Sequence, residues 1–261
     1  MSGTRRKALG QHFLKSQKVL NKIIEAIEPR ADETVLEIGA GKGALTFPLA
    51  ERVGRLICVE KDPGLWPYLE NAGSSNITLV KGDILELDFI RFLPEQPVKV
   101  VGNLPYSIST PLLFKIYACR EQFTRGVFML QKEVADRVCA SVGTKKLAPL
   151  SLLFQNRFET RLHCNVPPGS FSPPPKVDSA VISLTKRDTP LVDIRDDDKF
   201  SAFLHRCFQQ RRKKLSNNLK AAGFSLELIQ KILSDCAIPQ NARPEQVGLK
   251  SFACLYHAFL K

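Results

Sequence analysis

Short apolar runs alternate with helical stretches along the first part of the chain, and this alternation constrains the fold more than any other feature. Runs typical of buried strands lie at 34–38, 55–59, 77–80, 98–101 and 127–130. Helical spacing of apolar residues follows Ser16, a candidate N-cap, and recurs at 46–53, 112–118 and 132–139. This β-α-β-α order predicts a mostly parallel sheet with helices on both faces.

The pattern changes from about Phe158. Two β-rich runs, 158–164 and 180–184, flank the segment VPPGSFSPPPKVD, which leaves no room for a crossover helix and predicts an antiparallel edge hairpin. After Arg187 only helical patterns follow, at 199–209, 213–222, 226–234 and 249–260. We therefore expect an α/β domain over residues 1–188 and a small all-helical domain over residues 189–261.

The charge balance favours a polyanionic partner. The 261 residues hold 38 Lys and Arg against 26 Asp and Glu, for a formal net charge of +12. Charge runs are often only solvated faces, but two acid-free clusters together account for the whole excess, which favours RNA and a steep salt dependence of binding. They are residues 1–24, with Arg5, Arg6, Lys7, Lys15, Lys18 and Lys22, and residues 206–220, with Arg206, Arg211, Arg212, Lys213, Lys214 and Lys220.

Several other classes of protein are disfavoured. No run of about 18 apolar residues is long enough for a membrane span, and the amino terminus lacks the apolar core of a secretory signal. The seven cysteines contain no CxxC pair and the four histidines no zinc-type spacing, so we expect no metal and buried free thiols. These features predict a soluble cytoplasmic protein.

A glycine-rich turn follows the first predicted strand, in VLEIGAGKGALT. Glycines in such a turn allow close approach to a ligand, although many serve packing alone. The spacing of Gly39, Gly41 and Gly43 is G-x-G-x-G, which differs from the dinucleotide fingerprint. Glu37, just before the turn, would repel a pyrophosphate and suits a ligand with a positive group.

Acidic residues end three successive predicted strands. Glu37, Glu60 and Asp83 are each compatible with a solvated strand end, but together they are expected to converge on the crevice where open α/β sheets bind ligands. A carboxylate at Glu60 is suited to ribose hydroxyls, and one at Asp83 to an adenine amino group. The joint pattern predicts a cofactor of nucleoside type.

The fourth predicted strand ends in the string Asn103-Leu104-Pro105-Tyr106. An Asx turn into a proline would explain it structurally. A chemical interpretation explains more, because an exocyclic adenine amine is a poor nucleophile whose lone pair is delocalised into the ring. The Asn103 carboxamide oxygen and the Leu104 carbonyl would accept hydrogen bonds from both amine hydrogens, Pro105 would stiffen the turn, and Tyr106 would offer a face to an extruded base.

Strings spread over nearly the whole chain resemble the KsgA family of small-subunit ribosomal RNA adenine dimethyltransferases, which are S-adenosylmethionine-dependent Rossmann-like methyltransferases. The matching strings are KALGQHFL, EIGAGKGALT, VEKD, GD, GNLPYSISTPLL, LQKEVADR, FSPPPKVDSAV and FQQRRKKLSNNL. The resemblance implies a Rossmann-like methyltransferase sheet, with S-adenosyl-L-methionine as cofactor.

The resemblance also implies roles for individual residues. Many relatives carry Asn where His12 stands, and an alternative for Phe171 is simple packing under the hairpin. The implied cofactor residues are Gln11, His12 and Leu14 at the methionine end, Gly39 and Gly41 at the turn, Glu60 at the ribose, Asp83 and Ile84 at the adenine, and Asn103. The implied target-adenosine and RNA residues are Asn103, Leu104, Pro105, Tyr106, Phe171, Arg211, Arg212 and Lys213.

The function that the resemblance implies is dimethylation of two adjacent adenosines near the 3′ end of small-subunit (16S) ribosomal RNA, by a monomer acting on an immature particle. One alternative is a large-subunit RNA methyltransferase of the erythromycin-resistance type. A second is a non-catalytic RNA-binding assembly factor, and a third, disfavoured by the glycine spacing, is an NAD-dependent oxidoreductase.

Overall fold

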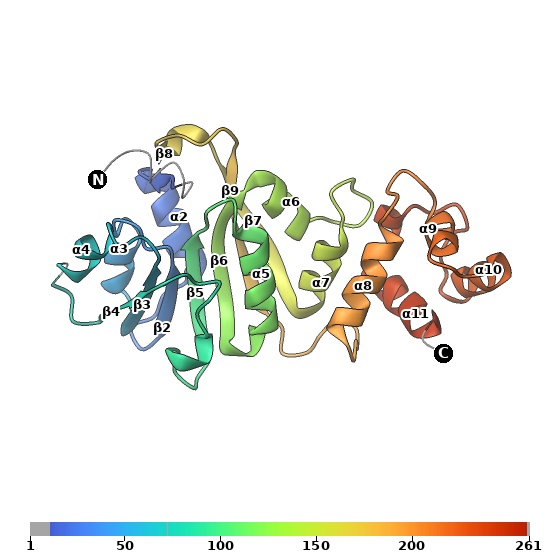
Figure 1. The fold of residues 1–261 in the computed structure, drawn as a ribbon, viewed down its shortest axis with the longest axis horizontal. Coiled ribbons are helices and arrows are strands. Elements are labelled where there is room, and N and C mark those ends of the chain that lie inside the picture. Colours follow the sequence, from blue (N-terminus) through green and yellow to red (C-terminus); the bar gives the residue numbers. More distant parts are fainter. Residues whose placement is uncertain (1–10, 72, 260–261) are drawn as a thin grey trace. The chain divides into compact units, whose positions relative to one another are not determined.

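The structure is a computed structural model that describes residues 11–71 and 73–259 (Figure 1). The chain forms two compact units, which are described separately. The first holds the described residues up to Ala135 together with Thr160–Lys186, and the second holds Asp136–Glu159 and the chain from Arg187 onward. The second unit thus resumes beside the expected boundary at 188, but it also includes 136–159, which the sequence patterns assign to the first domain.

The first unit is built on a seven-stranded sheet in the order β4-β3-β2-β5-β6-β9-β7. The five strands β4 to β6 in that order are parallel, β9 is antiparallel to β6, and β7 forms the edge. The predicted mostly parallel sheet with an antiparallel edge is therefore confirmed. The strands are β2 (Thr34–Ile38), β3 (Arg55–Glu60), β4 (Ile77–Lys81), β5 (Val98–Asn103), β6 (Phe123–Gln131), β7 (Phe158–Val166) and β9 (Ser179–Lys186).

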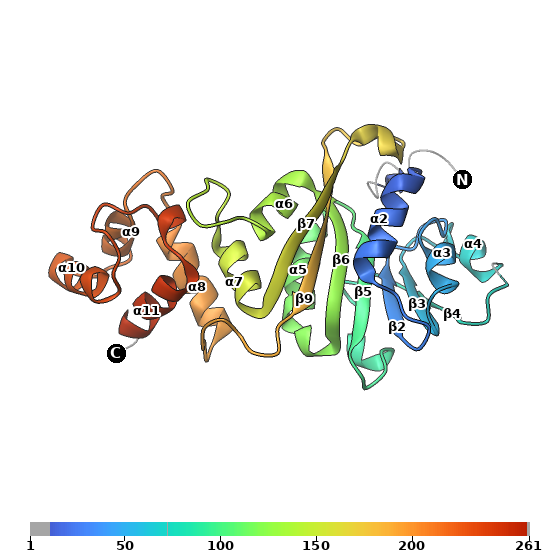
Figure 2. The ribbon, with the colours of Figure 1, turned by 180° about the vertical axis from the view of Figure 1, so that it is seen from behind.

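Successive side chains of the buried strands point to opposite sides, so the sheet has two apolar faces. Val35 and Met129 belong to a core with the apolar side of α2, whereas Leu36 and Phe128 lie outside that core on the opposite face. Helix α5 lies in front of the strands in Figure 1 and behind them in Figure 2. The helices of this unit are α2 (Gln17–Ile27), α3 (Thr46–Ala50), α4 (Trp66–Glu70) and α5 (Ser109–Ala118), with short turns at Phe89–Arg91, Arg120–Gln122 and Pro168–Ser170.

A two-stranded ribbon that the sequence patterns did not predict ties the start of the described chain to the proline-rich loop. Strand β1 (Phe13–Leu14) pairs antiparallel with β8 (Phe171–Ser172), and the Lys15 N–H donates to the Ser170 carbonyl at 2.9 Å. We call residues 11–15 the strap. Because residues 13–15 of the strap pair with 170–172, two segments about 160 residues apart in sequence are positioned together.

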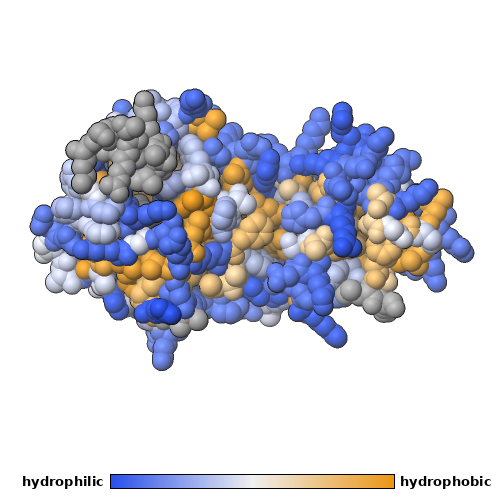
Figure 3. Space-filling model, in the orientation of Figure 1, coloured by the Kyte–Doolittle hydropathy of each residue, from blue (hydrophilic) through white to orange (hydrophobic). Residues whose placement is uncertain are grey.

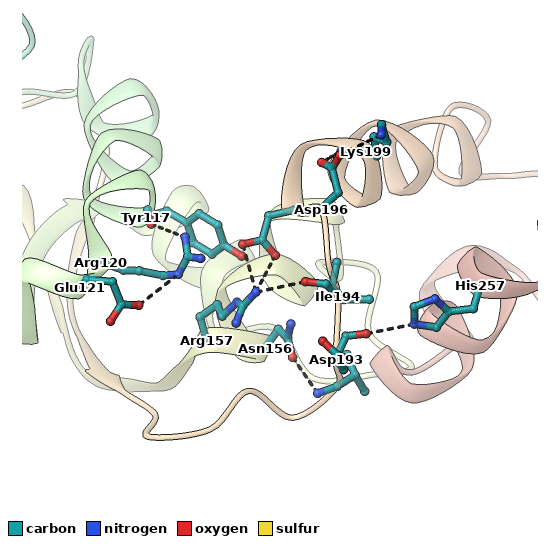
Figure 4. Close-up of polar contacts among 12 residues, drawn as sticks. Tyr117, Arg120, Glu121, Asn156, Arg157, Asp193, Ile194, Asp196, Lys199 and His257 are labelled. Atoms are coloured by element: carbon teal, nitrogen blue, oxygen red, sulfur yellow. Dashed lines mark hydrogen bonds and ion pairs between the residues drawn. The ribbon is translucent and has the colours of Figure 1, made fainter. Parts of the chain in front are cut away.

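The second unit is helical, as expected, although it contains one helix that the patterns did not predict. Helix α7 (Pro149–Arg157) has almost no amphipathic pattern, and its polar residues bind the start of α8 and the segment before it (Figure 4). Arg157 Nη2 lies 3.1 Å from the Asp197 carboxylate, and Asn156 Oδ1 accepts from the Val192 N–H at 2.9 Å. The other helices are α8 (Asp197–Cys207), α9 (Leu215–Ala221), α10 (Leu226–Asp235) and α11 (Leu249–Phe259), while α6 (Lys132–Val138) spans the division between the units.

The expectation of free thiols is wrong for two cysteines. Cys236 and Cys254, 18 residues apart, form a disulfide with a Cα–Cα distance of 5.7 Å, which links the end of α10 to α11. Helix packing brings the pair together, so the spacing in sequence gives no sign of it. No helix among the described residues is long and apolar enough to cross a membrane, and no group of three potential metal ligands occurs in that part of the chain.

Candidate active site

A cavity of about 290 Å³ lies at the carboxyl ends of β2, β3 and β5. The position is the one that open α/β sheets use for ligands, and all of its walls belong to the first unit. Its lining includes Gln11, His12, Phe13, Ile38, Gly39, Gly41, Glu60, Asp62, Asp83, Ile84, Asn103, Leu104, Pro105, Tyr106, Ser107 and Phe171.

The glycine-rich turn forms one wall of the cavity. Gly39 and Gly41 have φ values of +75° and +62°, a region in which a side chain strains the backbone. A Cβ built on Gly41 would lie 3.4 Å from the Phe13 ring, so the strap packs directly on the turn. Gly43 also has a positive φ but does not line the cavity. Glycine at 39 and 41 therefore leaves bare backbone facing a ligand.

Glu60 is fixed by the backbone of two loops. Its Oε2 accepts from the Gly41 N–H and its Oε1 from the Asp62 N–H, both at 2.8 Å. Burial raises the pKa of Glu60, and these backbone donors oppose part of that rise. Because each carboxylate oxygen has a second acceptor direction, the side chain is held in place while it remains able to bind hydroxyl donors.

Asp83 lies at the rim of the same cavity. Its carboxylate pairs with the Lys61 ammonium at 2.5 Å and accepts from the Leu85 N–H at 3.0 Å. Burial alone would raise the pKa of Asp83, but the hydrogen bond and charge of Lys61 lower it overall. Asp83 is thus an ionised acceptor, next to Ile84, which supplies an apolar wall.

Glu37 does not reach the cavity, contrary to the expected convergence of three acids. Successive side chains of β2 point to opposite faces of the sheet, so Ile38 lines the cavity and Glu37 is buried on the other side. There its Oε2 accepts from the Cys58 thiol at 3.6 Å. Burial raises the pKa of Glu37 to about 7, against the lowering effect of Thr46 and Cys58.

The strap determines how the Asn103 amide is oriented. Asn103 ends β5, and its Nδ2 donates to the backbone carbonyl of His12 at 3.1 Å. Among the described residues no donor takes its Oδ1, so the amide presents a free acceptor. The Leu104 N–H donates to the Met129 carbonyl at 3.1 Å, which ties the turn after β5 to β6.

Two aromatic residues line the same cavity as Asn103. The Tyr106 hydroxyl lies 2.7 Å from Ser179 Oγ, and burial raises its pKa. The Tyr106 and His12 ring centroids are 5.7 Å apart. Phe171, on β8, lines the cavity but is only 2% exposed and belongs to the apolar core. Its stacking on a target base stays a prediction.

Side chains of the strap contact both the loop after β3 and the proline-rich loop. Gln11 Nε2 donates to the Asp62 carboxylate at 3.2 Å, and His12 Nδ1 lies 2.8 Å from the Pro173 carbonyl oxygen. Leu14 belongs to the apolar core and not to the cavity, because neighbouring residues of β1 face opposite ways. Phe13 occupies the cavity wall instead. Sequence reasoning missed Phe13 and Asp62, although both stand inside the strings KALGQHFL and VEKD.

The helix expected from residue 213 begins at Leu215, so the predicted RNA-binding residues Arg211, Arg212 and Lys213 lie in a turn before α9. The Arg211 guanidinium donates to the carbonyls of Lys145 and Leu147, the second at 2.8 Å, so it holds the chain before α7. Arg212 and Lys213 are exposed, and hydrophilic side chains cover much of this unit in Figure 3. Arg5, Arg6 and Lys7 of the other basic cluster lie outside the described residues.

Comparison with known proteins identifies the family of this chain. The family model described as ribosomal RNA adenine dimethylase matches residues 3–256. The chain belongs to this family. It is 44% identical to the ribosomal RNA small subunit methyltransferase A of Geobacter sulfurreducens, with 98% of this chain and 95% of the relative aligned. It is 40% identical to the protein of that name from Legionella pneumophila (strain Corby), with 96% of each covered.

Two solved structures of similar proteins cover both units. A dimethyladenosine transferase from Plasmodium falciparum is 28% identical, with a TM-score of 0.82 over 95% of this chain and 98% of that one. The 23S rRNA methyltransferase ErmE is 25% identical, with a TM-score of 0.77 over 95% of this chain and all of that one. The expected methyltransferase fold of this rRNA adenine dimethylase is therefore confirmed, together with its class of enzyme.

Proposed function

We propose that this rRNA adenine dimethylase transfers methyl groups from S-adenosyl-L-methionine to the N6 amines of two adjacent adenosines near the 3′ end of small-subunit ribosomal RNA. The observation that carries the proposal is the free Asn103 Oδ1, held at the rim of a cavity that also contains Glu60 and Asp83. An amine acceptor and a nucleoside site share one space, as methyl transfer to adenosine requires.

The residues of the cavity fit that methyl donor. Gln11 Oε1 is a buried acceptor without a partner among the described residues, in the part of the cavity where the resemblance puts the methionine end of the cofactor. Glu60 has acceptor capacity for ribose hydroxyls, and Asp83 for an adenine amino group. When bound, this cofactor supplies an electrophilic methyl group on a positively charged sulfur.

The residues of the chain act on the target amine chiefly by position. Asn103 Oδ1 and the Leu104 carbonyl accept the two amine hydrogens, which favours a pyramidal nitrogen with its lone pair directed at the methyl carbon. The amine becomes acidic once it has gained the methyl group, so no strong base is required. Tyr106 and Phe171 offer aromatic surface to a base that has left its stack. Proximity and removal of water supply the rate enhancement.

Small-subunit RNA is favoured over large-subunit RNA by the degree of similarity. The two small-subunit relatives described above are 44% and 40% identical, against 25% for the 23S rRNA methyltransferase. A non-catalytic assembly factor is disfavoured because the amine acceptor and the cofactor acceptors are all in place. We further propose that the protein acts as a monomer on an immature small-subunit particle in the cytoplasm.

The proposal is tested by mapping modified adenosines after small-subunit particles that lack the methyl groups are incubated with labelled cofactor. We expect two adjacent N6,N6-dimethyladenosines near the RNA 3′ end. Methylation of purified large-subunit RNA, with none on small-subunit particles, would favour the erythromycin-resistance alternative. A protein that binds particles without transferring label would favour the assembly-factor alternative.

Asn103→Ala tests the role of the amine acceptor within that reaction. Removing one well-placed acceptor is expected to lower kcat about 100-fold or more, by analogy with the loss of a single oxyanion-hole donor. The affinity for S-adenosylhomocysteine should change much less, as calorimetry would show. A loss of cofactor affinity that accounts for the whole loss of rate would refute the amine-positioning role.

A further inference from the structure

A second hollow lies on the α2 side of the first unit and shares no lining residue with the active-site cavity. It has a volume of about 300 Å³. Helix α2 and its C-cap contribute three of the charged residues, β6 contributes one, and β7 contributes two residues on one face of the strand. We call it the basic groove, and its charged or titratable residues are Lys22, Glu25, Glu28, Arg125, Arg161 and His163.

The cations of the basic groove are only partly neutralised. Arg125 Nη2 pairs with Glu28 Oε1 at 2.9 Å, which occupies that carboxylate. The Arg125 Nε is buried and has no hydrogen-bond partner among the described residues. Within the same part of the chain, Lys22 and Arg161 form no ion pair, so only Glu25 opposes them. A buried guanidinium N–H without a partner is costly, and an anion is the strongest acceptor that it can take.

The charged neighbours of His163 indicate that the electrostatic potential at this residue is positive. Its Nε2 lies 2.8 Å from Ser183 Oγ. Burial lowers the pKa of His163, and the charges of Arg161 and Arg125 lower it further, with only a smaller opposing effect from Glu28. At His163 the two arginines therefore outweigh Glu28.

We propose that the basic groove binds a phosphate group of the ribosomal RNA backbone, a contact that rests on the proposed function and extends the RNA interface beyond the active-site cavity. Exposed lysines connect the two regions: Lys15 ends the strap, and Lys18 follows on α2 four residues before Lys22. Arginine suits this role because its guanidinium donates two parallel hydrogen bonds to a phosphate.

Binding of methyl-deficient small-subunit particles to the full-length protein, measured over a range of salt concentrations, tests the proposal. Arg161→Ala should weaken binding about fivefold at low salt and reduce the log–log salt slope by about one. Arg91→Ala is the matched control, because Arg91 also lies in the first unit and its side chain is 84% exposed outside the groove. Glu25→Gln should act in the opposite direction and tighten binding, since it removes the unpaired carboxylate.

Equal salt slopes for Arg161→Ala, Arg91→Ala and the unchanged protein would overturn the proposal. A second experiment follows the His163 imidazole by NMR while inorganic phosphate is added. If phosphate saturates the groove but Arg161→Ala leaves particle binding unchanged, the ligand is a free anion and the RNA assignment is wrong. Absence of methyl transfer by the unchanged protein would refute the proposed function instead, because the groove is judged from binding differences alone.

Discussion

The side chain of His12 is expected to increase the rate of methyl transfer without touching either substrate. Its Nδ1 lies 2.8 Å from the Pro173 carbonyl, and its own backbone carbonyl accepts from Asn103 Nδ2. One residue therefore links the proline-rich loop to the Asn103 amide, the proposed acceptor of the target amine. Removing the imidazole frees the strap at this point and lets the Asn103 amide turn away from the amine.

The size of the effect follows from the single hydrogen bond that is lost. A side-chain to backbone hydrogen bond contributes about 1 kcal/mol net, which corresponds to about a fivefold change in rate. We expect His12→Ala to lower kcat about fivefold, with the affinity for S-adenosylhomocysteine nearly unchanged, because the Gln11–Asp62 contact and the β1–β8 pairing remain.

Two further variants separate the hydrogen bond from the packing of the ring. In His12→Asn the amide nitrogen is attached to Cγ, as Nδ1 is in histidine, so the donor is kept at the same number of bonds and kcat should recover to within about twofold. His12→Phe keeps a ring near Tyr106 but has no donor, and it should behave like His12→Ala. Single-turnover transfer to particles is the assay. An active His12→Phe together with a slow His12→Asn would refute the reasoning.

Three other changes have outcomes that the structure fixes in direction. The pKa of Glu37 is about 7 in the fold against an ordinary 4.5. Its contribution to stability is therefore complete below about pH 4.5 and is lost as the pH rises through about 7. Urea unfolding at pH 5 and pH 8 should show the free energy of unfolding of Glu37→Gln rising by about 3 kcal/mol relative to that of the unchanged protein. Gly102→Ala would put a Cβ 2.8 Å from the Ile38 carbonyl oxygen and 2.7 Å from Leu104, so it should cost about 2 kcal/mol in unfolding experiments and slow transfer, whereas Gly169→Ala, with open space around it, should do neither. Lys61→Met should tighten binding of S-adenosylhomocysteine at low salt and lose that advantage at high salt, because Lys61 competes for the Asp83 carboxylate; unchanged affinity at both salt levels would show that Asp83 does not receive the adenine.

The sequence predicted the sheet because its strands carry a strong local signal. A parallel strand buried on both faces is a short apolar run between turn residues, and Thr34–Ile38 begins and ends where that pattern predicts. The glycine turn and the acids at Glu60 and Asp83 could be placed for the same reason, since the carboxyl ends of neighbouring parallel strands meet at one edge. Glu37 was misplaced because that argument uses the position of a residue along the strand and ignores which face it points to.

The features that escaped prediction depend on contacts between distant segments. Helix α7 lacks an apolar stripe and is held by Arg157 and Asn156, so periodicity gives no sign of it. The Cys236–Cys254 bond arises from the packing of two helices whose spacing in sequence carries no pairing signal. Strands β1 and β8 have two residues each, which is below the length at which alternation can be recognised.

The strap shows why that limit matters for function. Its five residues contact the cofactor wall through Gln11 and Phe13, and they orient the amine acceptor through the His12 carbonyl. The same residues are paired to the loop that carries Phe171. If the target adenosine stacks on Phe171 as proposed, it acts on the hydrogen bonds that hold the strap beside the cavity. A bound cofactor would then act in the reverse direction with the same coupling free energy. Binding of cofactor and of RNA should accordingly be linked through the strap and its pairing with the loop of Phe171.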